Sequence, residues 1–139
     1  MPPAPIDPAP IDDVIRVANF RAELRRFLRQ SERVAAGRGL TPQRYLLLLM
    51  IKGAPDGSQR STVTELTERL QLAQHTVTGL VARAVRSGLI RREVSGKDRR
   101  VTYLKLTSRG DRLLTASFGD LDRDRRVLMD MIARFGGQI

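Results

Sequence analysis

The side chains best able to do chemistry in this chain are basic and small polar groups between residues 60 and 112. This stretch holds 12 basic and 5 acidic residues, an excess of seven in a chain whose net charge is +10. A concentrated excess of guanidinium groups attracts polyanions, of which nucleic acid is the commonest. An alternative source of the excess is a GC-rich genome, since only three of the 25 basic residues are lysines.

The sequence lacks the residues that other kinds of functional site need. The sequence has no cysteine, which excludes a disulfide framework, a cysteine-based zinc site and a thiol redox switch. The single histidine, His75, is too few for a histidine-based metal site, and it either contacts nucleic acid or is exposed and uninvolved. No phosphate-cradling glycine loop or nucleophile motif is present. We therefore expect a protein that is not an enzyme and that uses no metal or cofactor.

Residues 74–87 have the pattern of a helix with one apolar and one polar face. The polar face begins with small groups, which suit hydrogen bonds to base edges in a major groove. Farther along, Arg83 and Arg86 can reach phosphates, and the N-terminus of the helix itself favours phosphate oxygens. The apolar face is formed by Val77, Leu80, Val81, Ala84 and Val85.

A basic hairpin is predicted directly after this helix. Residues 89–93 and 100–107 read as two short strands, and Ser95–Asp98 is a turn sequence between them. A slender basic loop fits a minor groove, where a narrow groove strengthens the attraction of a guanidinium. The alternative is a solvated hairpin with no ligand. The basic residues of the hairpin are Arg91, Arg92, Lys97, Arg99 and Arg100.

The elements that must position these groups are mostly helical. We expect a proline-rich flexible tail over residues 1–11 and a single domain over 12–139. Its helices are expected at 12–36, at 43–52 after the Thr41-Pro42 cap, from a Thr62–Glu65 capping box to about residue 70, at 74–87 and at 108–135. The fold class is therefore mainly α with a small β-hairpin wing, a winged helix-turn-helix at 41–107 between long terminal helices.

The stretch Leu66–Leu114 resembles the multiple antibiotic resistance regulator (MarR) family. The matching pieces are TVTGLV from Thr76, SGLIRR from Ser87, DRR from Asp98 and LTSRG from Leu106, in that order. The flanking helices fit the topology of the family, so the resemblance covers about residues 12–135. It departs from the family at Gly79, where many relatives carry an arginine that reaches bases.

The resemblance implies a homodimer whose first and last helices form the dimerisation region, binding a pseudo-palindromic operator in double-stranded DNA, usually as a repressor. Long apolar faces on both terminal helices also favour a dimer, because a monomer would expose them. The rival interpretation is a winged-helix protein-interaction module that does not read DNA. The residues expected at the DNA are Gln74, His75, Thr76, Thr78, Gly79, Arg83, Arg86, Lys97, Asp98, Arg99 and Arg100.

Family resemblance also implies release of DNA by a small aromatic or anionic effector. The candidate lining residues are Phe20, Leu24, Tyr45 and Leu49, although these residues also suffice as core. No signal peptide is recognised, and the longest apolar run, Tyr45–Ile51, is far below the ~20 residues that span a bilayer. We expect a cytoplasmic protein with no membrane partner.

Overall fold

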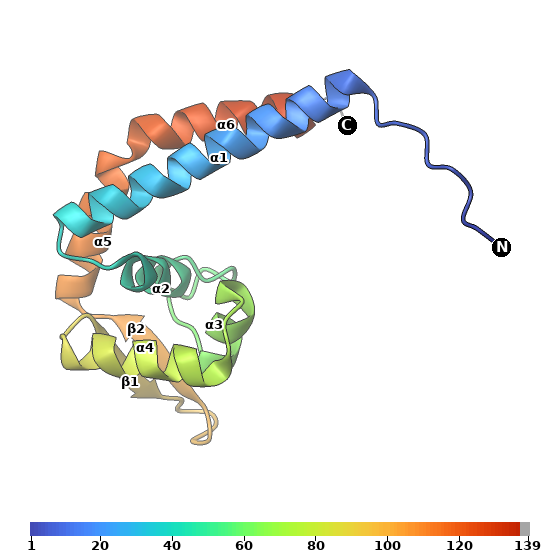
Figure 1. The fold of residues 1–139 in the computed structure, drawn as a ribbon. Coiled ribbons are helices and arrows are strands. Elements are labelled where there is room, and N and C mark those ends of the chain that lie inside the picture. The colour runs from blue at the N-terminus through green and yellow to red at the C-terminus, as the bar shows by residue number, and fades with distance from the viewer. Residues whose placement is uncertain (137–139) are drawn as a thin grey trace. The chain divides into compact units, whose positions relative to one another are not determined.

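The structure, a computed structural model that describes residues 1–136, is mainly helical with one two-stranded sheet (Figure 1). This confirms the predicted fold class, including the hairpin that follows the fourth helix. The elements in chain order are α1 (Ile11–Gly37), α2 (Pro42–Lys52), α3 (Val63–Leu70), α4 (Gln74–Arg86), β1 (Ile90–Val94), β2 (Thr102–Leu106), α5 (Ser108–Asp120) and α6 (Asp122–Gly136).

The chain divides into two compact units. The terminal unit comprises Met1–Gln30 together with the chain from Asp122 onward, and the central unit is Ser31–Leu121. In the terminal unit α1 and α6 lie side by side, and the rings of Phe20 and Phe135 stack with their centroids 5.0 Å apart. The predicted tail has no helix or strand over residues 1–10. The single domain predicted over 12–139 stays a prediction, and residues 137–139 lie outside the described part of the chain.

Helix α2 lies at the centre of the core of the central unit, as its nearly continuous apolar sequence predicts. Leu47, Leu48 and Ile51 are fully buried, whereas Leu46 is 38% exposed. The helix contacts α3, α4, α5 and β2. Burial of one face of each surrounding element against α2 therefore orients the elements that carry the basic residues.

Threonine caps begin three of the helices at the positions that the sequence predicts. The Thr62 side chain accepts a hydrogen bond from the Glu65 N–H, and the Glu65 carboxylate accepts one from the Thr62 N–H. Thr41 caps α2, with Pro42 at its first position, and Thr107 caps α5. Each cap satisfies N–H groups that a helix N-terminus otherwise leaves without a partner.

The wing is an antiparallel hairpin in which Ile90 pairs with Leu106 and Val94 with Thr102. Ser61 adds a bridge at the outer side of β2, since its N–H and C=O both pair with Leu104. The first strand begins one residue later than predicted, because the Leu89 N–H bonds to the Ala84 carbonyl and so belongs to the end of α4.

The last helix is not continuous, in contrast to the prediction of one helix over 108–135. It breaks at Leu121, where the backbone has φ −100° and ψ 7° and the N–H bonds to Phe118 and Gly119 carbonyls. Asp122 and Asp124 then provide the acidic first turn that favours a new helix. The apolar spacing continues across the break, with Leu121 itself buried, so periodicity alone could not reveal it.

A close backbone approach joins the end of α4 to the start of α5. The Leu89 carbonyl accepts from the Thr107 N–H at 3.0 Å, and the Thr107 hydroxyl donates to the Gly88 carbonyl at 2.6 Å. A Cβ placed on Gly110 would lie 2.2 Å from the Leu89 oxygen, inside the contact distance of any two such atoms. The glycine of the LTSRG sequence is therefore required for packing.

Replacing this glycine should destabilise the fold. We expect Gly110→Ala to lower the free energy of unfolding by about 1–3 kcal/mol, the usual effect of forcing atoms into a packed region, measured by urea denaturation. Gly119→Ala on the same helix is the control, because nothing lies within 4 Å of its Cβ position. The control should be unchanged or more stable by up to about 1 kcal/mol, and equal loss in the two variants would contradict this account.

Candidate nucleic-acid interface

Helices α3 and α4 form a helix-turn-helix whose turn is only three residues long. Gln71 adopts the left-handed conformation, φ 55° and ψ 44°, and its N–H bonds back to carbonyls of α3. Leu72 packs against the core, and Ala73 precedes α4. This tight turn lets α4 bury one side while its other side stays on the surface of the central unit.

The two faces of α4 are divided as the sequence predicts. Val77, Leu80, Val81 and Ala84 are buried, and Val85 packs against them half-buried. The predicted contact residues lie on the remaining surface: Thr76 and Gly79 are half-buried, and the exposed ones are Gln74, His75, Thr78, Arg83 and Arg86.

The N-terminus of α4 has no side-chain cap, unlike those of α2, α3 and α5. The residue at the cap position is Ala73, which has no hydrogen-bonding side chain. The first backbone N–H groups of a helix have no partner within it, and they attract anions together with the helix dipole. The start of α4 can therefore bind a phosphate or a base acceptor through Gln74, His75 and Thr76.

Gly79 sits on this surface without being needed by the fold. A Cβ at this position would meet only the Arg83 guanidinium, at 3.5 Å, which is an ordinary contact. A glycine in a helix interior is less favourable than alanine by up to about 1 kcal/mol. No contact within the chain therefore explains why residue 79 is a glycine.

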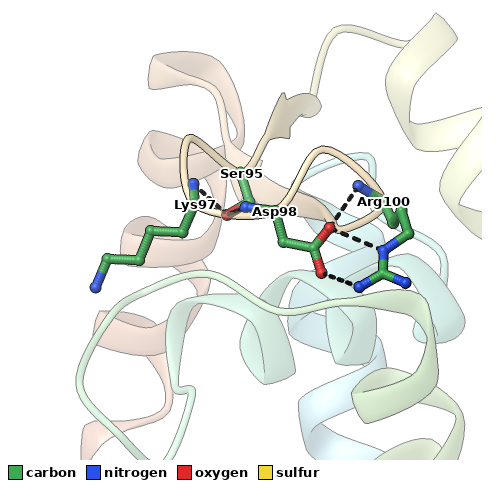
Figure 2. Close-up of polar contacts among 4 residues, drawn as sticks. All are labelled: Ser95, Lys97, Asp98 and Arg100. Carbon is green, nitrogen blue, oxygen red and sulfur yellow. Dashed lines mark hydrogen bonds and ion pairs between the residues drawn. The ribbon is translucent and has the colours of Figure 1, made fainter.

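At the wing tip, Asp98 binds Arg100 (Figure 2). The Arg100 Nε and backbone N–H donate to Asp98 Oδ1 at 3.1 and 3.0 Å, and Nη2 donates to Oδ2 at 3.2 Å. Hydrogen bonds from the Arg100 side chain, and then from its backbone, hold the pKa of Asp98 below its ordinary value of 3.8. Asp98 thus positions Arg100, whose side chain remains 90% exposed.

The turn itself is organised by Ser95. Its hydroxyl oxygen accepts from the backbone N–H of Lys97 at 3.2 Å and of Asp98 at 3.3 Å. The Lys97 side chain extends away from the Asp98–Arg100 pair (Figure 2). Lys97 and Arg99 are both exposed, so the tip presents cations in more than one direction.

Two features of the wing were not predicted from the sequence. The Arg60 guanidinium lies over the Tyr103 ring, 3.9 Å from its centroid, which places one more cation beside β2. Arg91 forms an ion pair with Glu93 at 3.3 Å, so its charge is partly balanced. Nothing in the sequence marked the contact between Arg60 and Tyr103 except the presence of an arginine before Ser61 and of an aromatic residue in β2.

The four predicted effector residues have different surroundings. Phe20 and Leu24 are half-buried in the terminal unit, where Phe20 stacks on Phe135. Tyr45 is 5% exposed in the core of the central unit. Leu49 alone among the four lines a described cavity, which has a volume of about 320 Å³ and also borders Lys52, Asp111, Leu114 and Phe118.

Among residues 1–136, no group of three or more histidine, cysteine or acidic side chains could hold a metal ion. None of the described helices is long and apolar enough to cross a membrane.

Comparison with known sequences gives a family match over the central unit. Residues 38–101 match the sequence model of the MarR family. The chain is also similar to the HTH-type transcriptional repressor YetL of Bacillus subtilis (strain 168), with 33% identity over 79 residues. That alignment covers 57% of this chain and 46% of YetL, so it spans less than half the length of the relative.

Solved structures show the same fold over most of the chain. A cysteine-to-serine mutant of MarR from E. coli has a TM-score of 0.66 at 18% identity, covering 90% of this chain and 86% of that one. A mutant of MepR from S. aureus, bound to an oligodeoxyribonucleotide, has a TM-score of 0.64 at 23% identity, covering 82% and 81%. At these identities the likeness establishes the fold alone.

The Asp98–Arg100 pair gives a testable pH dependence. Because the pKa of Asp98 is lowered, its carboxylate binds Arg100 at neutral pH and releases it only as the pH falls below 3.8. We expect an NMR titration of the Asp98 carboxyl to have its midpoint below 3.8 and to move upward in Arg100→Gln. Asp56 is the internal control, because Ser58 lowers its pKa. An Asp98 midpoint that Arg100→Gln leaves unchanged would disprove the pairing.

Proposed function

We propose that this chain belongs to the MarR family and is a transcription regulator that acts by binding double-stranded DNA. The observation that carries the proposal is the pairing of two surfaces in the central unit. One is the outer face of α4 with its uncapped N-terminus, and the other is the wing tip with its oriented Arg100. Both surfaces carry positive charge or hydrogen-bond donors, and DNA offers negatively charged phosphates together with hydrogen-bond acceptors on its bases.

In this proposal α4 reads a major groove. Its first two turns offer Gln74, His75, Thr76 and Thr78, whose short polar groups can reach base edges only if the helix lies deep in the groove. The absence of a side chain at Gly79 permits that close approach. Arg83 and Arg86, farther along, extend to the phosphates on either side.

The wing is proposed to enter the adjacent minor groove. Arg100, held in direction by Asp98, is the group best placed for the narrow groove, and Lys97 and Arg99 contact the flanking phosphates. Holding the guanidinium beforehand reduces the side-chain entropy that binding would otherwise remove. Asp98 thus contributes to DNA binding by orienting Arg100.

A salt series tests this function directly. On a duplex from the promoter region of its own gene, or one selected from random DNA, log affinity should fall linearly with log salt, by about 0.9 for each phosphate neutralised. Arg100→Ala should lower the binding free energy by about 1–3 kcal/mol. Arg33→Ala, which removes an equal charge from the exposed surface of α1, should change it little.

Two results would count against the proposal. Absence of any binding at low salt would favour the rival function, a winged-helix module that contacts other proteins. Equal losses in Arg100→Ala and Arg33→Ala would mean that only the overall charge matters and that the wing makes no defined contact.

We further propose that the chain is a homodimer that recognises a pseudo-palindromic operator, acting as a repressor. The support is the exposed apolar surface of the terminal unit, which two side-by-side helices share. Two-fold symmetry would space two recognition helices about one DNA turn apart, which a palindromic site matches. The exposed apolar residues are Ile11, Val14, Ile15, Val17, Leu28, Val127, Met129 and Ile132.

Sedimentation equilibrium tests the dimer. The chain should have twice its 15.6-kDa mass, and Val14→Glu/Met129→Glu, which places a charge on each helix of that surface, should have the mass of one chain. Asn19→Glu/Arg123→Glu is the control, because both residues are exposed polar positions on the same two helices. A monomeric parent chain would refute the dimer, and a dimer that survives Val14→Glu/Met129→Glu would refute its assignment to this surface.

Release of DNA by a small aromatic or anionic effector stays a prediction. Its support within the central unit is limited to Leu49, which borders a cavity, since Tyr45 is a core residue. A regulator that binds chromosomal DNA is expected in the cytoplasm, and this location also stays a prediction.

A further inference from the structure

The three lysines of this chain have different surroundings, although 22 of its 25 basic residues are arginines. The Nζ of Lys52 lies 3.1 Å from Oδ1 of Asp111. Lys105 is half-buried in β2, where it pairs in register with Arg91 of β1. Lys97 is exposed in the turn at the wing tip, and within the described part of the chain its Nζ has no hydrogen bond or ion pair. Lys97 therefore has the most accessible amine of the three.

The fold directs the Lys97 side chain away from the acidic residue beside it. The Ser95 hydroxyl oxygen accepts from the Lys97 N–H at 3.2 Å and from the Asp98 N–H at 3.3 Å, which fixes the backbone of the turn. The Asp98 carboxylate is bound by Arg100, with side-chain donors at 3.1 and 3.2 Å (Figure 2). A Cβ on the neighbouring Gly96 would meet nothing within 4 Å. A reagent in solution can therefore reach the Lys97 amine.

Among the cations of the wing tip, Lys97 differs from the arginines in its reactivity. An amine that has lost its proton is a nucleophile, whereas the guanidinium groups of Arg99 and Arg100 stay protonated in proteins. Acylation converts a lysine ammonium into a neutral amide. The two arginines also attract a negatively charged acyl donor toward the tip. Reaction at this one position would therefore change the charge of a surface that is proposed to contact DNA.

We propose that Lys97 is an acylation site, at which an acyl phosphate or an acyl thioester transfers its acyl group to Nζ. The neutral amine attacks the acyl carbonyl carbon, a C–N bond forms, and the C–O or C–S bond of the donor breaks. The phosphate or thiolate leaves with the bonding electron pair, and a proton of the amine passes to water. The wing tip then carries one positive charge fewer, which weakens its attraction to DNA phosphates. This effect on DNA rests on the proposed function, whereas the reaction itself does not.

Acetylation of the full chain without DNA tests the site. The chain is incubated with acetyl phosphate in one arm and with acetyl coenzyme A in the other, and mass spectrometry of proteolytic peptides follows the acetylated fraction of each lysine over time. In at least one arm Lys97 should react roughly two to five times faster than Lys52, because an exposed ion pair protects an amine only modestly. Lys105 should also react more slowly than Lys97, because it is half-buried. The arm that reacts identifies the class of donor.

Binding of a DNA duplex tests the consequence. Lys97→Gln, which removes the charge as acetylation does, should make log affinity fall less steeply with log salt, by about 0.9 per chain. Lys97→Arg keeps the charge but cannot be acylated, so it should bind like the parent chain and keep its affinity after treatment with the acetyl donor. Lys52→Gln is the matched control, because it removes an equal charge from α2, outside the wing, and it should leave the slope unchanged.

The proposal is overturned if Lys97 reacts no faster than Lys52 with either donor. It is also overturned if Lys97→Gln weakens DNA binding no more than Lys52→Gln does, because acylation at the wing tip would then have no effect. If the parent chain binds no duplex, the proposed function is overturned, and the effect on DNA with it. Selective acetylation of Lys97, which is measured without DNA, would still be found in that case, so the two failures are distinguishable.

Discussion

The backbone of α5 meets the carbonyl oxygen of Leu89 at Gly110, and this approach leaves no room for a side chain. Residues 87–90 end α4 and begin β1. The carbonyl groups of Gly88 and Ser87 accept hydrogen bonds from the side chains of Thr107 and Arg109. Gly88, with φ +74°, allows the chain to reverse at this point. The direction of α4, the start of the wing and the start of α5 thus depend on one junction.

A few acidic side chains of the central unit pair with basic ones. Asp98 orients a cation at the wing tip, and Asp120 holds Arg38. Lys52 and Asp111 pair on another side of α5. Each of these pairs is at least partly exposed, so its contribution to stability is small and its effect is mainly on direction. Asp98 and Asp120 therefore act mainly by fixing the direction of an arginine side chain.

Prediction from the sequence succeeded where the causes are local. The Thr62–Glu65 capping box, the Thr41-Pro42 start and the apolar face of α4 follow from neighbours three or four residues apart. It failed at Leu121, because apolar periodicity continues across a break in the helix. The structure adds that Asp98, which was predicted among the DNA-contact residues, pairs with Arg100, and its place at the DNA stays a prediction.

Composition and short-range spacing were enough to predict most of the helices, the hairpin, the basic stretch and the absence of cysteine chemistry. Which arginines are held by other residues became clear only from contacts between distant parts of the folded chain. Arg60 reaches Tyr103, Arg109 reaches Ser87 and Arg38 reaches Asp120 across 22 to 82 residues of sequence, and no periodic pattern records such distant pairs. Long-range packing brings these groups together, so their roles appear only when the chain is folded.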